Sequence, residues 1–180
     1  MQVNIELSLR THEVYQLFER RINGDRLFIQ AILHKFNIVI NHSRQQPPQK
    51  LTRYTEMRQT IICLTQQFNS EAVRFEALLT KRGNFDHKKI SYAVKFQPSI
   101  IVTNSLAIQL IEFIEIYDKL IAILKLLHLA GCFDSDEAYF GNIKRFQKMA
   151  NTMLSDLILA PTTTMPNDLN AYLLEENTTR

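Results

Sequence analysis

Cationic and amide side chains are concentrated in one short stretch of this sequence, between positions 81 and 97. The cations of the stretch are Lys81, Arg82, Lys88, Lys89 and Lys95, with Asp86 as an opposing charge. Lysine and arginine neutralise phosphate groups, which adds affinity for nucleic acid without sequence choice. Ser91 and Gln97 lie in the same stretch and carry hydroxyl and amide groups that suit hydrogen bonds to base edges. These residue types together indicate binding of double-stranded DNA.

An alternation of polar and apolar residues predicts that residues 89–97 form a strand. The apolar side of that strand would be Ile90, Tyr92, Val94 and Phe96, and the polar side Lys89, Ser91, Lys95 and Gln97. A lone strand leaves its edges unpaired, so it requires a partner. If the partner is the same strand of a second chain, the pair forms a two-stranded ribbon that fits the major groove. We therefore predict a homodimer that binds DNA through this polar side, with Lys88 and Arg82 at the phosphates.

A structural interpretation accounts for the same cations without DNA. Lysines on the exposed side of an edge strand protect it against aggregation. Ser91 and Gln97 on the same predicted face favour the DNA-binding interpretation, because their side chains can reach base edges. The first strand of the chain, near residues 3–9, is a competing candidate for the ribbon, and it could also pair with the second strand.

Catalytic and metal-binding chemistry has little support in the sequence. Four glycines do not build a phosphate-binding loop, and Cys63 and Cys132 form no metal or redox motif, so we interpret both as reduced core residues. Glu112, Glu115 and Asp118 lie about one turn apart, a spacing that general acid-base chemistry could use. A solvated or salt-bridged helix face explains them more simply, since Glu115 stands four residues before a lysine. We predict that the protein is not an enzyme and holds no cofactor or metal.

Helical periodicity dominates the rest of the chain. A strand near residues 3–9 precedes a short helix and a second helix that ends before Pro47. A long amphipathic helix follows over residues 51–81, and its apolar seam would face either the core or a partner helix. The helix over residues 104–130 is apolar almost all round and must be buried on most sides, and a last helix covers about 134–159. We predict a mainly α fold, a helical bundle with a short β-ribbon.

Length and composition indicate a single domain. The 180 residues contain 46% hydrophobic and 22% charged residues, which suits one globular unit over residues 1–160. Residues 161–180 are rich in threonine and asparagine and are expected to form a flexible tail. The net charge of +3 is small, so any DNA contact must come from a local patch. The sequence shows no secretory signal and no membrane span, and we expect a cytoplasmic protein.

Several short segments resemble the AcaB-like family of integrative and conjugative elements and conjugative plasmids. The resemblance covers residues 3–160, and the segments that carry it are Arg10-Thr11-His12, Leu17-Phe18-Glu19-Arg20, Val94-Lys95-Phe96, Thr103-Asn104-Ser105, Tyr117-Asp118-Lys119-Leu120 and Leu129-Ala130-Gly131. It implies a ribbon-helix-helix type of core with extra helices, acting as a dimer on DNA in the control of transfer genes. The same resemblance assigns Lys89, Ser91, Lys95 and Gln97 to the ribbon.

Two functional hypotheses follow. The first is a DNA-binding transcription regulator of a conjugative or integrative element, which binds as a dimer through a basic ribbon. The alternative is a non-enzymatic adaptor of a conjugation or type IV secretion system. In that case the helical body, or a short helix near residues 169–174 of the tail, would bind a partner protein.

Overall fold

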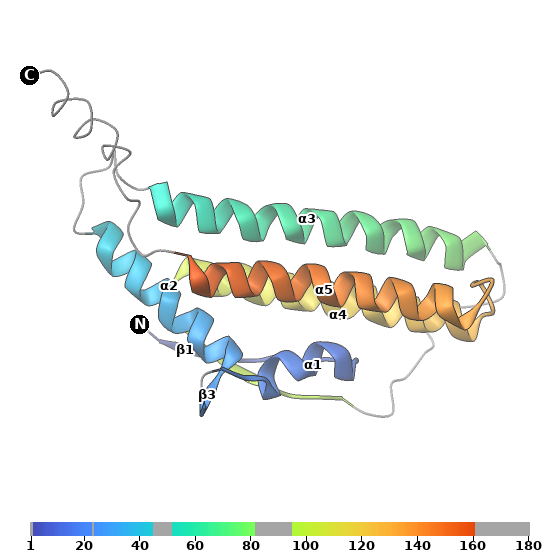
Figure 1. The fold of residues 1–180 in the computed structure, drawn as a ribbon, viewed down its shortest axis with the longest axis horizontal. Helices are drawn as coiled ribbons and strands as arrows, with labels where there is room; N and C mark the ends of the chain where they lie inside the picture. The colour runs from blue at the N-terminus through green and yellow to red at the C-terminus, as the bar shows by residue number, and fades with distance from the viewer. Residues whose placement is uncertain (1, 23, 45–51, 82–94, 161–180) are drawn as a thin grey trace, which may run out of the picture.

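The computed structural model describes residues 2–22, 24–44, 52–81 and 95–160. Five helices and four short strands occur in these residues (Figure 1). The helices are α1 (His12–Glu19), α2 (Phe28–Arg44), α3 (Thr52–Lys81), α4 (Ser105–Leu129) and α5 (Asp136–Leu159). The strands are β1 (Val3–Glu6), β2 (Arg21–Ile22), β3 (Arg26–Leu27) and β4 (Ser99–Val102). The predicted mainly helical bundle with a short β-ribbon is confirmed.

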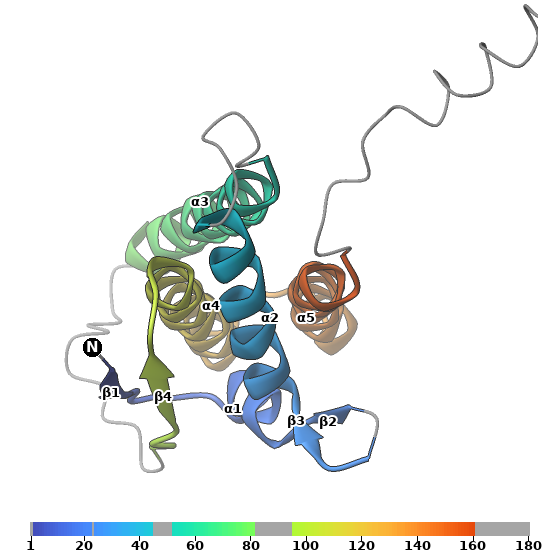
Figure 2. The ribbon, with the colours of Figure 1, turned by 90° about the vertical axis from the view of Figure 1, so that its left-hand side faces the viewer.

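Helix α4 forms the centre of the bundle. Long helices α3 and α5 run alongside it, while α2 crosses one end and α1 lies beneath (Figures 1 and 2). Its apolar residues are buried on nearly every side, as its sequence predicts, because α1, α2, α3, α5 and β4 all contact it. The cover that α4 requires is thus present within one chain.

An aromatic cluster joins the three long helices. The Phe68 ring of α3 makes edge-on contacts with Phe113 and Tyr117 of α4, each at 5.4 Å between ring centroids. Phe146 of α5 lies at the same distance from Phe68. Edge-to-face pairs add stabilisation beyond the area that the rings bury. Most of the predicted apolar seam of α3, including Met57, also faces this core rather than solvent.

Local sequence signals set the ends of the helices. The Asn104 side chain accepts a hydrogen bond from the Ala107 N–H at 3.0 Å and so caps α4. Gly131 follows α4 with a φ of 62°, a left-handed conformation that glycine adopts without steric cost. Ser135 caps α5 by accepting from the Ala138 N–H at 3.2 Å, and acidic residues occupy the first turn where the helix dipole favours them.

The ribbon differs from its prediction in position and partner. The predicted second strand covered residues 89–97, whereas β4 spans Ser99–Val102 and pairs antiparallel with β1 of the same chain. Residues 95–98 continue alongside the first strand, since Leu9 and Phe96 exchange backbone hydrogen bonds of 2.9 Å and Leu7 donates to the Pro98 carbonyl. Pro98 lacks an N–H and serves here as an acceptor only. Val3 to Leu9 is extended as predicted, although β1 itself ends at Glu6.

The predicted flexible tail and most of the predicted strand over residues 89–97 are not described by the structure. The tail over residues 161–180 lies outside the described residues, as do positions 82–94. Within the part of the chain that is described, every helix is too short or too polar to cross a membrane.

Candidate functional site

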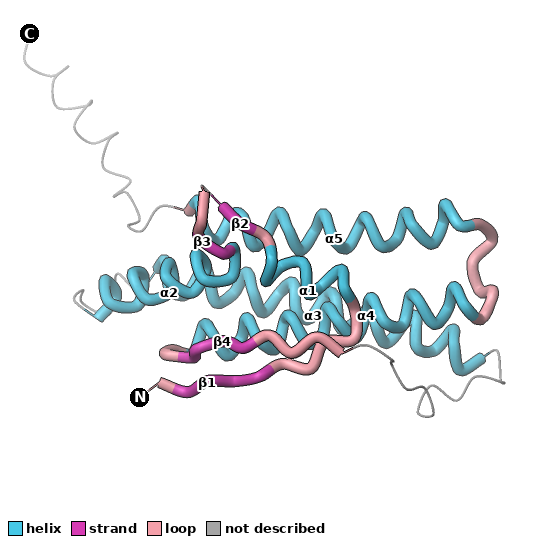
Figure 3. The backbone as a smooth tube through the Cα atoms, turned by 90° about the horizontal axis from the view of Figure 1, so that it is seen from below, coloured by secondary structure: helices cyan, strands magenta, loops and turns pink. Residues whose placement is uncertain are grey.

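The ribbon presents a continuous polar face to solvent. Register places Asn4 opposite Ile101 and Glu6 opposite Ser99, and the Leu9–Phe96 bridge extends the same register. Ser8 therefore lies opposite Gln97, and Arg10 lies opposite Lys95. We call these eight residues the ribbon face: Asn4, Glu6, Ser8, Arg10, Lys95, Gln97, Ser99 and Ile101. All of them are exposed. Figure 3 shows the two paired segments side by side at the edge of the molecule.

Burial of the opposite side holds this face outward. Leu7, Leu9, Ile100 and Val102 alternate with the ribbon face and belong to the hydrophobic core. Side chains in a strand point alternately to opposite faces, so a slip of one residue would expose the whole apolar set. The orientation of the ribbon face is therefore determined by packing against the helices.

Charge is distributed unevenly along the ribbon face. Arg10 and Lys95 lie opposite each other at one end, Glu6 lies in the middle, and the far end carries Asn4 and Ile101. Two cations against one carboxylate leave a net charge of +1 on the face. Hydroxyl and amide groups lie between these charges. Ile101 is 58% exposed, an unusual position for a large apolar side chain.

A buried carboxylate fastens the cationic end of the ribbon to the helices. Asp118 of α4 accepts hydrogen bonds from the Thr11 N–H at 2.9 Å and from the Thr11 hydroxyl at 2.7 Å. The Arg10 N–H donates to both carboxylate oxygens, at 3.0 and 3.1 Å. Burial raises the pKa of Asp118, and the hydrogen bonds from Thr11 and Arg10 oppose that shift. These hydrogen bonds to Asp118 hold residues 10 and 11, where the chain passes from the ribbon into α1, against α4.

The structure brings together only part of the predicted site. Lys95 and Gln97 lie on the ribbon face, as the alternation predicted. Arg82, Lys88, Lys89 and Ser91 lie outside the described residues.

The first strand, a competing candidate for the ribbon in the sequence, pairs with the second strand of the same chain. Its residues Asn4, Glu6, Ser8 and Arg10 supply half of the ribbon face. The sequence signal for this pairing is the matching alternation of residues 3–10 and 95–102. Each of these segments is followed by a helix.

The remaining acidic and histidine residues of α4 lie on its surface or contact neighbouring helices. Glu112 and Glu115 are exposed on α4, and Lys119 forms an ion pair with Glu76 of α3 at 3.0 Å, not with Glu115 as the sequence indicated. His128 stacks on Tyr139, with ring centroids 4.1 Å apart.

Both cysteines are free thiols, but only one contacts the core. Cys63 is exposed, contrary to its prediction as a core residue, whereas Cys132 is half-buried and packs against the core. A search of the described residues for three or more histidine, cysteine, aspartate or glutamate side chains placed to hold a metal ion found none.

Comparison with known proteins gives a structural match. No protein-family model matches the chain, and a search of curated proteins finds no match. The fold is similar to the crystal structure of selenomethionine-containing AcaB from uropathogenic E. coli, with a TM-score of 0.72 and 13% sequence identity. The match covers 87% of this chain and 77% of the AcaB chain. The chain therefore has an AcaB-like fold.

Proposed function

We propose that this protein binds double-stranded DNA by placing the ribbon face in the major groove. The observation that carries the proposal is the two-stranded ribbon itself, whose outward side is polar along most of its length and cationic at one end. The major groove admits a two-stranded antiparallel ribbon, and its base edges present hydrogen-bond donors and acceptors to side chains.

Each position of the ribbon face suits a distinct contact. The Gln97 and Asn4 amides suit bidentate hydrogen bonds to adenine, and Ser8 and Ser99 suit single hydrogen bonds to base edges. Lys95 and Arg10 suit phosphate groups or guanine at the cationic end. Ile101, exposed beside Asn4, suits contact with a thymine methyl group. Glu6 would accept a hydrogen bond from cytosine, so the middle of the ribbon would select its base pair.

The cations that precede the ribbon in sequence extend the proposed contact. Lys88 and Lys89 lie six or seven positions before Lys95, and Arg82 precedes them. The proposal assigns these three cations to phosphate groups that flank the groove.

One chain supplies both strands of the proposed DNA-binding ribbon. Strand β1 is followed by α1 and β4 by α4, so two strand-then-helix units pair within the chain. The prediction of a dimer depended on an unpaired strand and an uncovered α4, and both find partners inside one chain. The dimer stays a prediction, and DNA binding by the ribbon no longer requires it.

The proposed biological role is that of a transcription regulator of a conjugative or integrative element. Two observations support this role: the sequence resemblance to the AcaB-like family and the likeness of the fold to AcaB. The alternative role, an adaptor of a secretion apparatus, would use the helical body or a short helix near residues 169–174 of the tail to bind a partner. The apolar faces of α4 and α3 are packed mainly within the chain, and the tail lies outside the described residues.

Binding to DNA at increasing salt tests the proposal. A preferred sequence would first be selected from a random duplex pool by the full-length protein, and its affinity then measured by fluorescence anisotropy. We expect Lys89→Ala combined with Lys95→Ala to reduce the salt slope by about two, because each lost phosphate contact removes about 0.9 from it. The matched control is Lys144→Ala with Lys148→Ala, which removes two exposed lysines from α5, away from the ribbon (Figure 2).

Base readout needs a separate variant. Gln97→Ala should lose about 1–3 kcal/mol of discrimination at one base pair while leaving the salt slope unchanged. Gln66→Ala, an exposed glutamine on α3, is its control and should change neither quantity. Failure to enrich any sequence, or equal affinity and slope for the lysine double variant and the wild type, would exclude DNA binding by the ribbon.

A further inference from the structure

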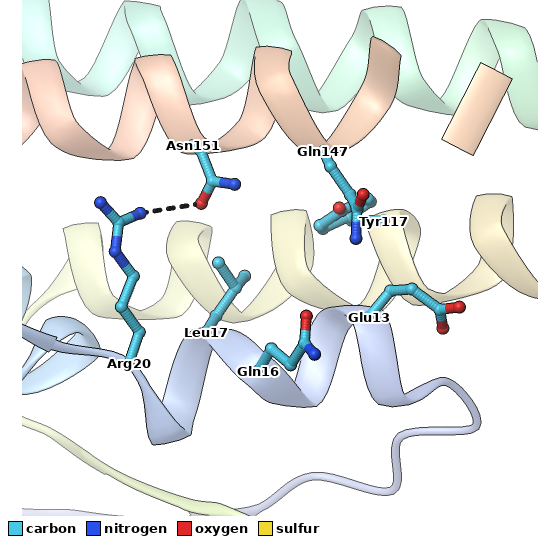
Figure 4. A pocket seen from close by; sticks show the side chains of 7 residues that line it. All are labelled: Glu13, Gln16, Leu17, Arg20, Tyr117, Gln147 and Asn151. Carbon is cyan, nitrogen blue, oxygen red and sulfur yellow. Dashed lines mark hydrogen bonds between the residues drawn. The ribbon is translucent and has the colours of Figure 1, made fainter. Parts of the chain in front are cut away.

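A cavity lies between α1, α4 and α5, apart from the ribbon face. Its volume is about 480 Å³, within the range of small-molecule sites. The polar lining residues are Glu13, Gln16, Arg20, Tyr117, Gln147 and Asn151. Figure 4 shows that α1 supplies one wall, with Arg20 toward one end and Glu13 toward the other, while Gln147 reaches from α5 toward Tyr117. The cavity therefore presents both signs of charge and several amide groups.

Tyr117 contributes a phenol to the lining of the cavity. The residue is 1% exposed and its ring packs in the aromatic cluster, and its hydroxyl makes no side-chain hydrogen bond within the described residues. Burial raises the pKa of Tyr117, and the nearby negative charge of Glu13 raises it further, so the phenol stays protonated. A bound molecule that forms a hydrogen bond with this hydroxyl gains affinity from the contact.

Arg20 supplies an anion-binding group at one end of the cavity. Its guanidinium donates to the Asn151 side-chain oxygen at 3.0 Å and lies over the Phe28 ring at 4.3 Å from the centroid. No carboxylate is paired with it in the described part of the chain. A guanidinium has five N–H donors in a planar fork, so it can bind a carboxylate while keeping the Asn151 contact.

Glu13 supplies the opposite charge two helical turns away. Arg20, which directly follows α1, lies seven positions after Glu13, and seven positions correspond to about 10 Å along a helix. One Glu13 oxygen pairs with Lys125 at 2.7 Å, and a carboxylate has further acceptor sites beyond that contact. One end of the cavity can therefore bind a negative group through Arg20, and the other end can bind a positive group through Glu13.

We propose that this cavity binds a small zwitterion of the amino-acid or dipeptide type. The carboxylate of the ligand pairs with Arg20, and its ammonium group lies toward Glu13. The Tyr117 hydroxyl and the amides of Gln16 and Gln147 bind the polar groups between them. This site is independent of the proposed DNA contact, because no residue of the ribbon face lines the cavity.

Thermal unfolding of the full-length protein, without DNA, tests the site. The probes are the twenty L-amino acids and glycylglycine at millimolar concentration, followed by calorimetric titration of the probe that raises the melting temperature most. The N-acetyl and C-amide derivatives of that probe, each lacking one charge, should bind at least tenfold more weakly. Absence of stabilisation by every probe, or equal binding of the zwitterion and both derivatives, overturns the proposal.

Variants separate ligand binding from folding. Tyr117→Phe removes only the hydroxyl, so it should weaken binding of the selected probe by about tenfold while leaving unfolding of the free protein unchanged. Arg20→Gln should weaken binding at least as much. Its control, Arg21→Gln, alters the neighbouring exposed arginine, which pairs with Asp25 at 3.3 Å on the surface. Equal affinity of the Tyr117→Phe and Arg20→Gln variants and the wild type would show that the probe binds elsewhere.

Discussion

Replacing Asp118 by alanine is expected to destabilise the folded protein by about 3 kcal/mol. The carboxylate accepts hydrogen bonds from two donors of Thr11, which is 1% exposed, and from the backbone of Arg10. Alanine would leave both Thr11 donors buried and unsatisfied, at a cost of about 1–3 kcal/mol each. The Arg10 N–H lies nearer the surface and can be hydrated. The two donors together would cost about 2–6 kcal/mol. Removing the buried charge of Asp118 offsets part of this cost, so the expected loss of unfolding free energy is about 3 kcal/mol.

The Asp118→Asn variant should lose less than Asp118→Ala. Asparagine keeps one carbonyl oxygen for the Thr11 donors and removes the cost of burying a charge. Its amide N–H groups would face the Arg10 N–H, so one hydrogen bond is lost and the destabilisation should be about 1 kcal/mol.

The difference in stability between wild type and Asp118→Asn should depend on pH. Burial raises the pKa of Asp118 above its ordinary value of 3.8, so the native state binds the proton more tightly than the unfolded chain. The unfolding free energy of the wild type, relative to Asp118→Asn, should therefore decrease as the pH rises from 3.8 through the raised pKa. Above that pKa the difference should be constant.

Urea unfolding followed by circular dichroism measures these free energies. Glu115→Ala is the matched control, because Glu115 is an exposed carboxylate about one turn before Asp118 on α4. Its substitution should change the unfolding free energy by no more than about 0.5 kcal/mol. A loss below about 1 kcal/mol for Asp118→Ala would show that the carboxylate does not hold the end of the ribbon.

Two further substitutions test the packing and the cap. Phe68→Ala should lower the unfolding free energy by about 3–5 kcal/mol, because Phe68 contacts three other aromatic rings and is fully buried. Val73→Ala, 55% exposed on the same helix, should have little effect, and similar losses for the two variants in urea unfolding would contradict the proposed core. Asn104→Ala should cost about 1 kcal/mol through loss of the α4 cap, with Asn69→Ala as the exposed control. An unchanged urea midpoint for Asn104→Ala would show that the cap contributes nothing.

The helices and their ends follow from local sequence. Apolar residues at a spacing of 3.6 predicted α3, α4 and α5, and the all-round apolar character of α4 predicted its central position. Short polar residues precede both α4 and α5, and in the structure Asn104 and Ser135 satisfy free N–H groups of the first turns. Each of these signals depends on residues a few positions apart, so the sequence alone is sufficient.

The candidate site could be predicted only in part. The alternation predicted that Lys95 and Gln97 face away from the apolar side, and both are exposed on the ribbon face. It could not identify the strand partner, because two alternating segments match one another equally well within a chain or between chains. The predicted strand also ended at residue 97, whereas pairing continues to Val102.

The sequence by itself determined the helices of the bundle, the extended first strand and the apolar side of the ribbon. Only the tertiary structure decided that β1 pairs with β4, and that Asp118 is a buried acceptor, not a member of a surface carboxylate cluster. It also placed Arg20 and Tyr117 around one cavity. The physical reason is range: periodicity and caps act between near neighbours, whereas these contacts join residues about a hundred positions apart. Such contacts depend on how the whole core packs.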